Sequence, residues 1–158
     1  MLLFSIISTG FKKINNLISN KQVFWDLETS GAGKKEHPKA FASTPKWEQI
    51  LQIAAIVVDE SLQPTNQNMN EFCRPRTSII AQPGALLTTQ QGIKESLQAK
   101  HSSYELISMI NNKFEEWKKE NDNLVFIGHN IVNFDSPVLE YNLFNNLYFP
   151  YIDRKSRG

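Results

Sequence analysis

The segment Val23-Phe-Trp-Asp-Leu-Glu-Thr-Ser-Gly31 opens as an apolar, β-prone run and ends in glycine. This pattern predicts a buried strand that leads into a turn. Side chains two apart on a strand point the same way, so Asp26 and Glu28 project together, about 7 Å apart by strand rise, and Leu27 points to the opposite face. Two neighbouring acids repel each other and lose hydration unless a cation or a shared proton compensates. Because hard cations such as Mg²⁺ and Mn²⁺ take oxygen ligands, the pair indicates a metal site.

A third acid ends the segment Gly128-His-Asn-Ile-Val-Asn-Phe-Asp135. An apolar run at 124–127 predicts a short buried strand before it, and a helix is expected over about 134–147. An aspartate at a helix amino terminus is stabilised by the backbone dipole, which is the ordinary reason for its presence. Directly after a buried strand, Asp135 is also placed to join the acidic pair. His129 is expected to be structural or substrate-contacting, because no second His or Cys stands at metal-ligand spacing.

Strand and helix signals alternate along the body of the chain. An apolar, β-branched run at 50–58 predicts a central strand, and the capping box Ser102-Ser-Tyr-Glu105 begins a helix with an apolar stripe. The other expected segments are a strand at 22–27, a long loop at 31–47, a turn at 59–68, a shorter strand at 69–74, an irregular link from Pro75 to Pro83 and a short helix capped by Thr89. Together they predict an α/β domain whose mixed sheet, a three-strand antiparallel meander plus a further strand, is flanked by helices. Such sheets tend to bind ligands where strand ends meet helix starts, which is where the acids lie.

Length and composition fit one globular domain. The chain has 158 residues, of which 41% are hydrophobic and 21% charged, which is typical of a soluble protein large enough to bury a core. The single cysteine, Cys73, excludes an internal disulfide and fits a reducing compartment, so a cytoplasmic location is expected. No apolar stretch approaches the roughly 20 residues that cross a bilayer, so no membrane is expected as a partner.

The charge is unevenly distributed. Residues 1–47 carry seven lysines and three acids, a net charge of +4, and residues 48–150 carry seven basic and twelve acidic residues, a net charge of −5. A basic amino-terminal part beside acidic chemistry is compatible with a polyanionic substrate, and it is equally compatible with a solvated loop.

The first twenty residues form a separate segment. Five apolar residues recur there at helical spacing with two lysines between them: Phe4, Ile7, Phe11, Ile14 and Ile18, with Lys12 and Lys13. A secretory signal fits poorly because the start is not basic and the apolar run spans only about six residues. A transit peptide would contain arginine, and none precedes Arg74. The simpler interpretation is a peripheral helix or frayed extension at 1–20, packed on a domain over 21–158.

These motifs resemble one family. The chain is similar to the exonuclease domain of the DEDD 3′→5′ exonucleases, which have a ribonuclease-H-like fold, and within them to the exodeoxyribonuclease I branch. The first motif, Asp-x-Glu-Thr, stands at Asp26 to Thr29, and the second, Asn-x-x-x-Phe-Asp, stands at Asn130 to Asp135. The six-residue spacing from His129 to Asp135 favours that branch over the proofreading exonucleases, which space the two by five. The resemblance covers about residues 22–151, and three further stretches support it: 47–54, 82–89 and 145–151.

The resemblance implies a mechanism and roles for particular residues. Two Mg²⁺ or Mn²⁺ ions hold the terminal phosphodiester of single-stranded DNA in this family. By resemblance, Asp26 bridges both ions, Glu28 binds the ion that activates water and Asp135 binds the other. Thr29 is expected to contact the terminal nucleotide, and Asn130 and Phe134 are expected to shape its pocket. Four lysines are candidates for contacts with the strand, although a solvated loop explains them equally well: Lys34, Lys35, Lys39 and Lys46.

One family motif has no match in this sequence. The third motif, His-x4-Asp, supplies the general base and the fourth metal carboxylate downstream of the second motif. Neither His37 nor His101 is followed by an aspartate five positions later, and Asp153 has no suitable histidine before it. Loss of a general base lowers a rate by roughly 10² to 10⁴. The sequence therefore predicts an incomplete nuclease domain whose carboxy-terminal part is missing, with apolar surface exposed where the missing helices would pack.

Two hypotheses follow from this departure. The chain is a 3′→5′ exonuclease of single-stranded DNA whose activity is absent or depends on a separate carboxy-terminal fragment. Alternatively, it is a catalytically inactive nucleic-acid-binding or interaction module that retains only the fold.

Overall fold

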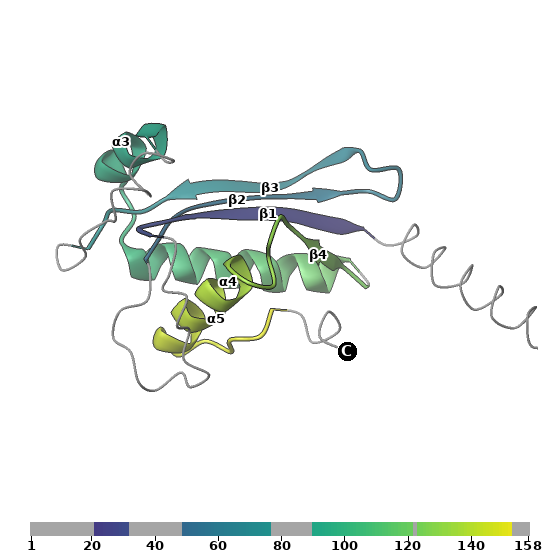
Figure 1. Ribbon diagram of the computed structural model, residues 1–158. Helices are drawn as coiled ribbons and strands as arrows, with labels where there is room; N and C mark the ends of the chain where they lie inside the picture. The colour runs from purple at the N-terminus through teal and green to yellow at the C-terminus, as the bar shows by residue number, and fades with distance from the viewer. Residues whose placement is uncertain (1–20, 32–48, 77–89, 122, 153–158) are drawn as a thin grey trace, which may run out of the picture.

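A computed structural model describes residues 21–31, 49–76, 90–121 and 123–152 (Figure 1). Four strands form one sheet in the order β3-β2-β1-β4, in which β1 pairs antiparallel with β2 and parallel with β4. The strands are β1 (Gln22–Thr29), β2 (Ile50–Val58), β3 (Pro64–Phe72) and β4 (Val125–Ile127), and the helices are α3 (Gln90–Gln98), α4 (Ser103–Glu120) and α5 (Asp135–Asn145). The predicted mixed sheet with flanking helices is confirmed.

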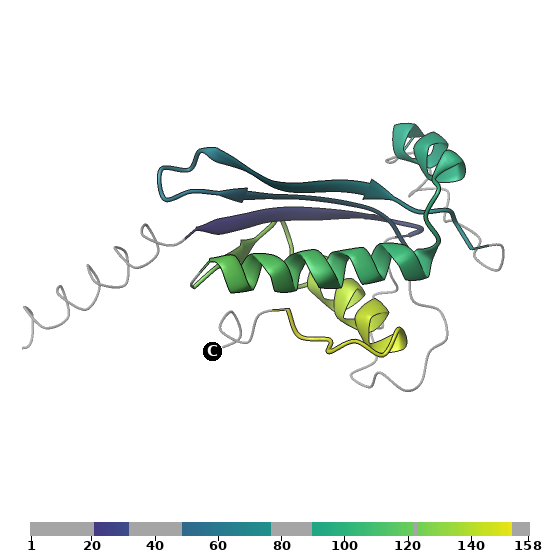
Figure 2. The ribbon, with the colours of Figure 1, turned by 180° about the vertical axis from the view of Figure 1, so that it is seen from behind.

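One face of the sheet carries the core. Helices α4 and α5 cover this face, and α3 lies on the opposite side, near the end of the sheet where β1 finishes (Figures 1 and 2). Val23, Trp25 and Leu27 of β1 alternate with more exposed residues and pack in the same cluster as Phe114 of α4 and Val138 of α5. The expected alternation along β1 is therefore confirmed, because its apolar side chains face the helices.

Helix α4 begins as its sequence predicts. Ser102 accepts a hydrogen bond from the N–H of Glu105, and the Glu105 carboxylate accepts one from the N–H of Ser102, which makes the capping box reciprocal. The predicted stripe along the helix is buried: Ile107, Ile110, Phe114 and Trp117. The last helix is shorter than the predicted 134–147, and β4 is one residue shorter than predicted, with only Phe126 buried.

The predicted turn at 59–68 is wrong over half its length. The turn spans only residues 59–63, where the Asp59 carboxylate accepts hydrogen bonds from the N–H groups of Ser61 and Gln63. Residues 64–68 already belong to β3. This stretch is polar because β3 is an edge strand, where exposed amide side chains replace the apolar ones of an inner strand, and Pro64 is tolerated because it is the first residue.

Several predictions concern residues outside the described ranges. They include the extension at 1–20, all but Gly31 of the loop at 31–47, the four candidate lysines, the Thr89 cap, and His37 and Asp153. Among the helices that the structure describes, none is long and apolar enough to cross a bilayer.

Candidate active site

The short strand β4 leaves part of β1 open at its edge. Only Gln22 to Phe24 of β1 pair with β4, and the chain turns away at Gly128. A Cβ atom on Gly128 would lie 2.7 Å from the main-chain oxygen of Trp25, closer than real Cβ contacts come. Glycine at this position therefore lets the turn after β4 pass directly against the open edge of β1.

The turn itself is built on Asn130. This residue has a φ of 53°, in the left-handed region that asparagine tolerates better than most residues. Its main-chain oxygen accepts hydrogen bonds from the N–H groups of Asn133 and Phe134, and its side-chain oxygen accepts one from the Asn133 amide at 3.1 Å. Asn130 therefore fixes the path of the chain into α5, a role that the sequence did not reveal.

Asp135 reaches the open edge of β1 from the first turn of α5. Its Oδ1 accepts a hydrogen bond from the main-chain N–H of Leu27 at 3.2 Å, and the residue is only 4% exposed. Leu27 stands between Asp26 and Glu28 in sequence, so the third acid contacts the strand at the centre of the acidic pair. The three acids, which come from opposite ends of the described chain, are thus brought together. We call Asp26, Glu28 and Asp135 the carboxylate cluster.

The carboxylates of this cluster repel one another. Burial and then the charge of Asp26 raise the pKa of Asp135 to about 6, although the N–H of Leu27, its own main-chain N–H and the nearby His129 oppose the rise. Burial raises the pKa of Glu28 as well, and the charges of Asp26 and Asp135 add to it. Among the described residues, Asp26 and Glu28 have no ion-pair partner.

The donor set has the chemistry that a divalent cation requires, but its side chains are not gathered around one point. Three carboxylates supply oxygen ligands, which suit Mg²⁺ and Mn²⁺. Among the described residues, no three His, Cys, Asp or Glu side chains stand close enough together to hold an ion as they are oriented. Asp26 is exposed on the strand, where its carboxylate can rotate. A bound cation would thus have to draw the Asp26 and Glu28 carboxylates toward Asp135, which the Leu27 N–H holds in place.

The residues expected to contact a nucleotide have structural contacts here. The Thr29 hydroxyl donates to the main-chain oxygen of Gly31 at 2.6 Å, at a register shift where β1 leaves β2. Phe134 is half-buried and packs against the core. His129 is exposed and acts on Asp135 only through its charge. These contacts fix the backbone around the carboxylate cluster, and they leave substrate roles for Thr29, Asn130 and Phe134 as predictions.

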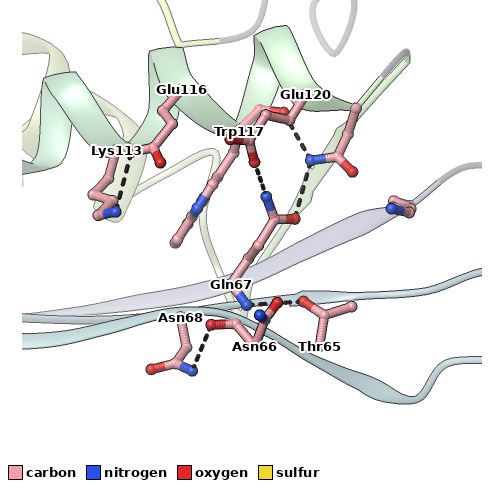
Figure 3. A pocket seen from close by; sticks show the side chains of 10 residues that line it. Thr65, Asn66, Gln67, Asn68, Lys113, Glu116, Trp117 and Glu120 are labelled. Carbon is pink, nitrogen blue, oxygen red and sulfur yellow. Dashed lines mark hydrogen bonds and ion pairs between the residues drawn. The ribbon is translucent and has the colours of Figure 1, made fainter.

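An open hollow of about 550 Å³ lies between β3 and the last turns of α4 (Figure 3). Its lining joins β3, the last turns of α4 and the residue before β1, and we call it the amide groove: Lys21, Thr65, Asn66, Gln67, Asn68, Lys113, Glu116, Trp117, Glu120 and Asn121. Gln67 donates to the Glu120 carboxylate and accepts from Asn121 at 3.1 Å, and Lys113 pairs with Glu116 at 3.0 Å. The polar groups of the groove therefore largely satisfy each other.

Solved structures provide the comparison with known proteins. The chain is similar to E. coli exonuclease I in complex with a dT13 oligonucleotide, with 24% sequence identity and a TM-score of 0.64 over 84% of this chain and 25% of that chain. It is also similar to the zinc-bound form of an E. coli exonuclease I–single-stranded DNA complex, with 23% identity and a TM-score of 0.67 over 87% of this chain and 26% of that one. No family model and no curated protein sequence matches the chain.

At this level of identity the likeness concerns the fold. The chain spans about a quarter of the length of the solved structures that it matches. The order of the strands, the meander followed by a parallel strand, and the helices agree with the predicted architecture. The chain therefore has the ribonuclease-H-like fold of exonuclease I.

Proposed function

We propose that this chain carries part of the active site of a metal-dependent 3′→5′ exonuclease that acts on single-stranded DNA. The hydrogen bond from the Leu27 N–H to the Asp135 carboxylate is the single observation that supports it most strongly. This contact joins the two sequence motifs at one strand, where Asp26 and Glu28 have no salt-bridge partner in the described part of the chain. An aspartate that only stabilises a helix start does not have to contact a strand that carries two further acids.

In this proposal each residue of the carboxylate cluster is a metal ligand. Asp26, Glu28 and Asp135 would hold the ions, either Mg²⁺ or Mn²⁺, with Asp26 shared between them. Such a pair of ions, when bound, activates the attacking water and stabilises the leaving 3′ oxygen. The Leu27 N–H fixes the position of Asp135 and favours its charged form, which a cation ligand requires.

The surrounding residues would position the substrate. Thr29 and the main chain beside it contact the terminal nucleotide, and Asn130 and Phe134 shape its pocket from the turn before α5. The complexes of exonuclease I with single-stranded oligonucleotides support this choice of substrate. We place the protein in the cytoplasm, in keeping with its single cysteine.

Activity in this proposal also requires a His-x4-Asp motif. The 158 residues contain no His-x4-Asp after Asp135, so the general base and the fourth carboxylate have no source among them. A separate carboxy-terminal fragment would supply both. The second candidate is a module that binds nucleic acid or protein and does not cleave.

A digestion assay separates the two candidates. The chain is mixed with a 3′-labelled single strand and Mg²⁺ or Mn²⁺, alone and with a polypeptide that carries the His-x4-Asp motif. We expect label release only in the mixture, and loss of roughly a hundredfold or more with Asp26→Ala. Glu60→Gln is the matched control, because Glu60 is an exposed acid in the turn between β2 and β3.

The outcomes are distinct. Digestion that survives Asp26→Ala belongs to a contaminant and counts against the nuclease. Retention of the labelled strand without cleavage, in every mixture and with either ion, favours the binding module. If the chain neither retains nor cleaves the labelled strand, the nuclease and the binding module are both wrong.

A further inference from the structure

Strand β3 is the edge of the described sheet. It pairs with β2 alone, on the side of the sheet away from β4. The N–H of Cys73 donates to the main-chain oxygen of Leu51, next to β2, at 3.0 Å. Because main-chain groups alternate in direction along an antiparallel strand, the N–H groups of Asn68 and Asn70 point away from β2. The outer side of β3 therefore presents main-chain donors and acceptors with which a further strand can pair.

This edge lacks most of the features that normally keep edge strands from pairing. Such strands carry lysines, internal prolines or bulges. The stretch 64–70, Pro-Thr-Asn-Gln-Asn-Met-Asn, contains no charged residue, and its proline is the first residue of the strand. The register shift between β2 and β3 lies between Ile56 and Val58, close to that proline, and the pairing from Asn68 to Phe72 is regular. Most of the edge is thus open to strand addition.

The side chains of β3 form two different rows. Gln67 reaches toward α4, where it donates to the Glu120 carboxylate, whereas Asn68 lies on the other side of the strand (Figure 3). Asn66, Asn68 and Asn70 are all exposed at alternate positions. Each asparagine amide both donates and accepts hydrogen bonds, so a row of asparagines is complementary to an antiparallel copy of itself. The strand that fits this edge is therefore one with uncharged amides at alternate positions, and β3 is such a strand.

We propose that two copies of this chain pair through their β3 strands, antiparallel and with the two-fold axis at Asn68, the central residue of Pro64–Phe72. This register overlaps the two strands completely. Asn68 then lies opposite Asn68 of the partner subunit, and Asn66 lies opposite Asn70 of the partner subunit, and each such pair exchanges two main-chain hydrogen bonds. Because the axis is perpendicular to the sheet, the two sheets become one, with the helices α4 and α5 of both copies on the same face (Figures 1 and 2).

The charges of this region are compatible with self-association. Glu71 is the only charged residue of β3, and in this register it falls opposite Thr65 of the partner subunit, so no like charges face each other along the strands. The amide groove beside β3 is lined by two lysines and two glutamates, which cancel. The whole chain has a net charge of only +1, which is too small to keep two copies apart. Because β3 carries no member of the carboxylate cluster, the pairing does not depend on the proposed nuclease.

A charge exchange at Asn68 tests this pairing. Light scattering after size-exclusion chromatography should give the unmodified full-length chain twice its mass of 18.1 kDa. Asn68→Lys and Asn68→Glu each place two like charges opposite each other at the axis, so each variant alone should dimerise at least tenfold more weakly. An equimolar mixture of the two variants should recover the dimer, because opposite charges then face each other.

The matched controls are Ser61→Lys and Ser61→Glu. Ser61 is exposed in the turn before β3, so both of these variants should dimerise as the unmodified chain does, alone and mixed. Circular dichroism checks that all four variants keep their fold.

Hydrogen exchange provides a second measurement that needs no variant. The N–H groups of Asn68 and Asn70 should exchange slowly in the dimer, although they point away from β2. The N–H of Met69 points toward β2 and serves as the internal reference, because it is protected whether or not the chain dimerises.

Four outcomes overturn the proposal. They are a monomeric unmodified chain, a dimer that Asn68→Lys and Asn68→Glu leave intact, a mixture of the two variants that stays monomeric, and fast exchange at Asn68 and Asn70 in the dimer. A monomer whose β3 edge is captured by a strand of another protein belongs to the first of these outcomes.

Discussion

The carboxylate cluster and the amide groove differ in how their charged groups are paired. In the groove, Lys113 pairs with Glu116, and Gln67 links Glu120 to Asn121 across the gap between sheet and helix (Figure 3). In the cluster, three acids lie together and raise the pKa values of Glu28 and Asp135.

This difference in charge pairing distinguishes polar groups that stabilise the fold from polar groups that are available to a ligand. A polar site whose groups satisfy each other stabilises the fold and has little left to offer a ligand. A site that keeps like charges together destabilises the fold, and such an arrangement persists where a ligand supplies the missing charge. The cluster is therefore the better candidate for chemistry.

The largest expected effect is that of Asp135→Asn on the free energy of unfolding in the absence of metal ions. Asp135→Asn keeps an oxygen that can accept from the Leu27 N–H and removes the buried charge. The pKa of Asp135 is about 6 in the folded protein against an ordinary 3.8, so folding loses stability as pH rises from about 4 to 6. The variant should gain about 3 kcal/mol in unfolding free energy at pH 8 and almost nothing below pH 4. Urea unfolding with a chelator present at both pH values measures the difference.

The groove provides the control for this substitution. Glu116→Gln removes an exposed charge that is paired with Lys113, and it should change stability by less than about 1 kcal/mol at either pH. A destabilised Asp135→Asn at pH 8 would show that Asp135 serves the fold and would remove the contrast between the two regions.

The next effect is the response to divalent ions. Mg²⁺ or Mn²⁺ at a hundred times its Kd should stabilise the folded chain by roughly 2.7 kcal/mol. The gain should be smaller at pH 5 than at pH 8, because Asp135 with a pKa of about 6 is then largely protonated. Thermal unfolding at fixed ionic strength, with Na⁺ as the control ion, measures both. An equal gain at the two pH values would assign the ion to other groups.

A smaller effect is expected where the turn meets β1. Gly128→Ala places a methyl group 2.7 Å from the Trp25 oxygen, so the turn must shift. We expect a loss of about 2 kcal/mol, as for other overpacked sites, together with a weaker response to Mn²⁺. Urea unfolding with and without the ion separates the two consequences. An unchanged response to the ion would mean that the position of Asp135 does not depend on this close contact.

The smallest effect is expected in the amide groove. Gln67→Ala removes the link between β3 and the end of α4, which is half-exposed, and should cost about 1 kcal/mol. The response to Mn²⁺ should stay as in the unmodified chain. A changed response to Mn²⁺ would show that the amide groove and the carboxylate cluster are energetically coupled.

The sequence predicted the sheet and α4 because local patterns determine them. Alternation along β1, the capping box at Ser102 and the apolar stripe of α4 are short-range signals. It missed the first half of β3, whose polar residues reflect the position of that strand at the sheet edge and not any local preference. It also missed the Leu27 N–H as the partner of Asp135, because the shortness of β4 leaves that donor open.

The central claim is that Asp26, Glu28 and Asp135 bind a divalent cation together. Electron paramagnetic resonance of Mn²⁺ tests it directly, since the signal of the free ion falls as the ion binds to the protein. The account predicts tight binding by the chain and by Glu60→Gln, and a loss of at least tenfold in affinity for Asp26→Asn and for Asp135→Asn alike. Binding that is unchanged in either of those two variants would contradict it.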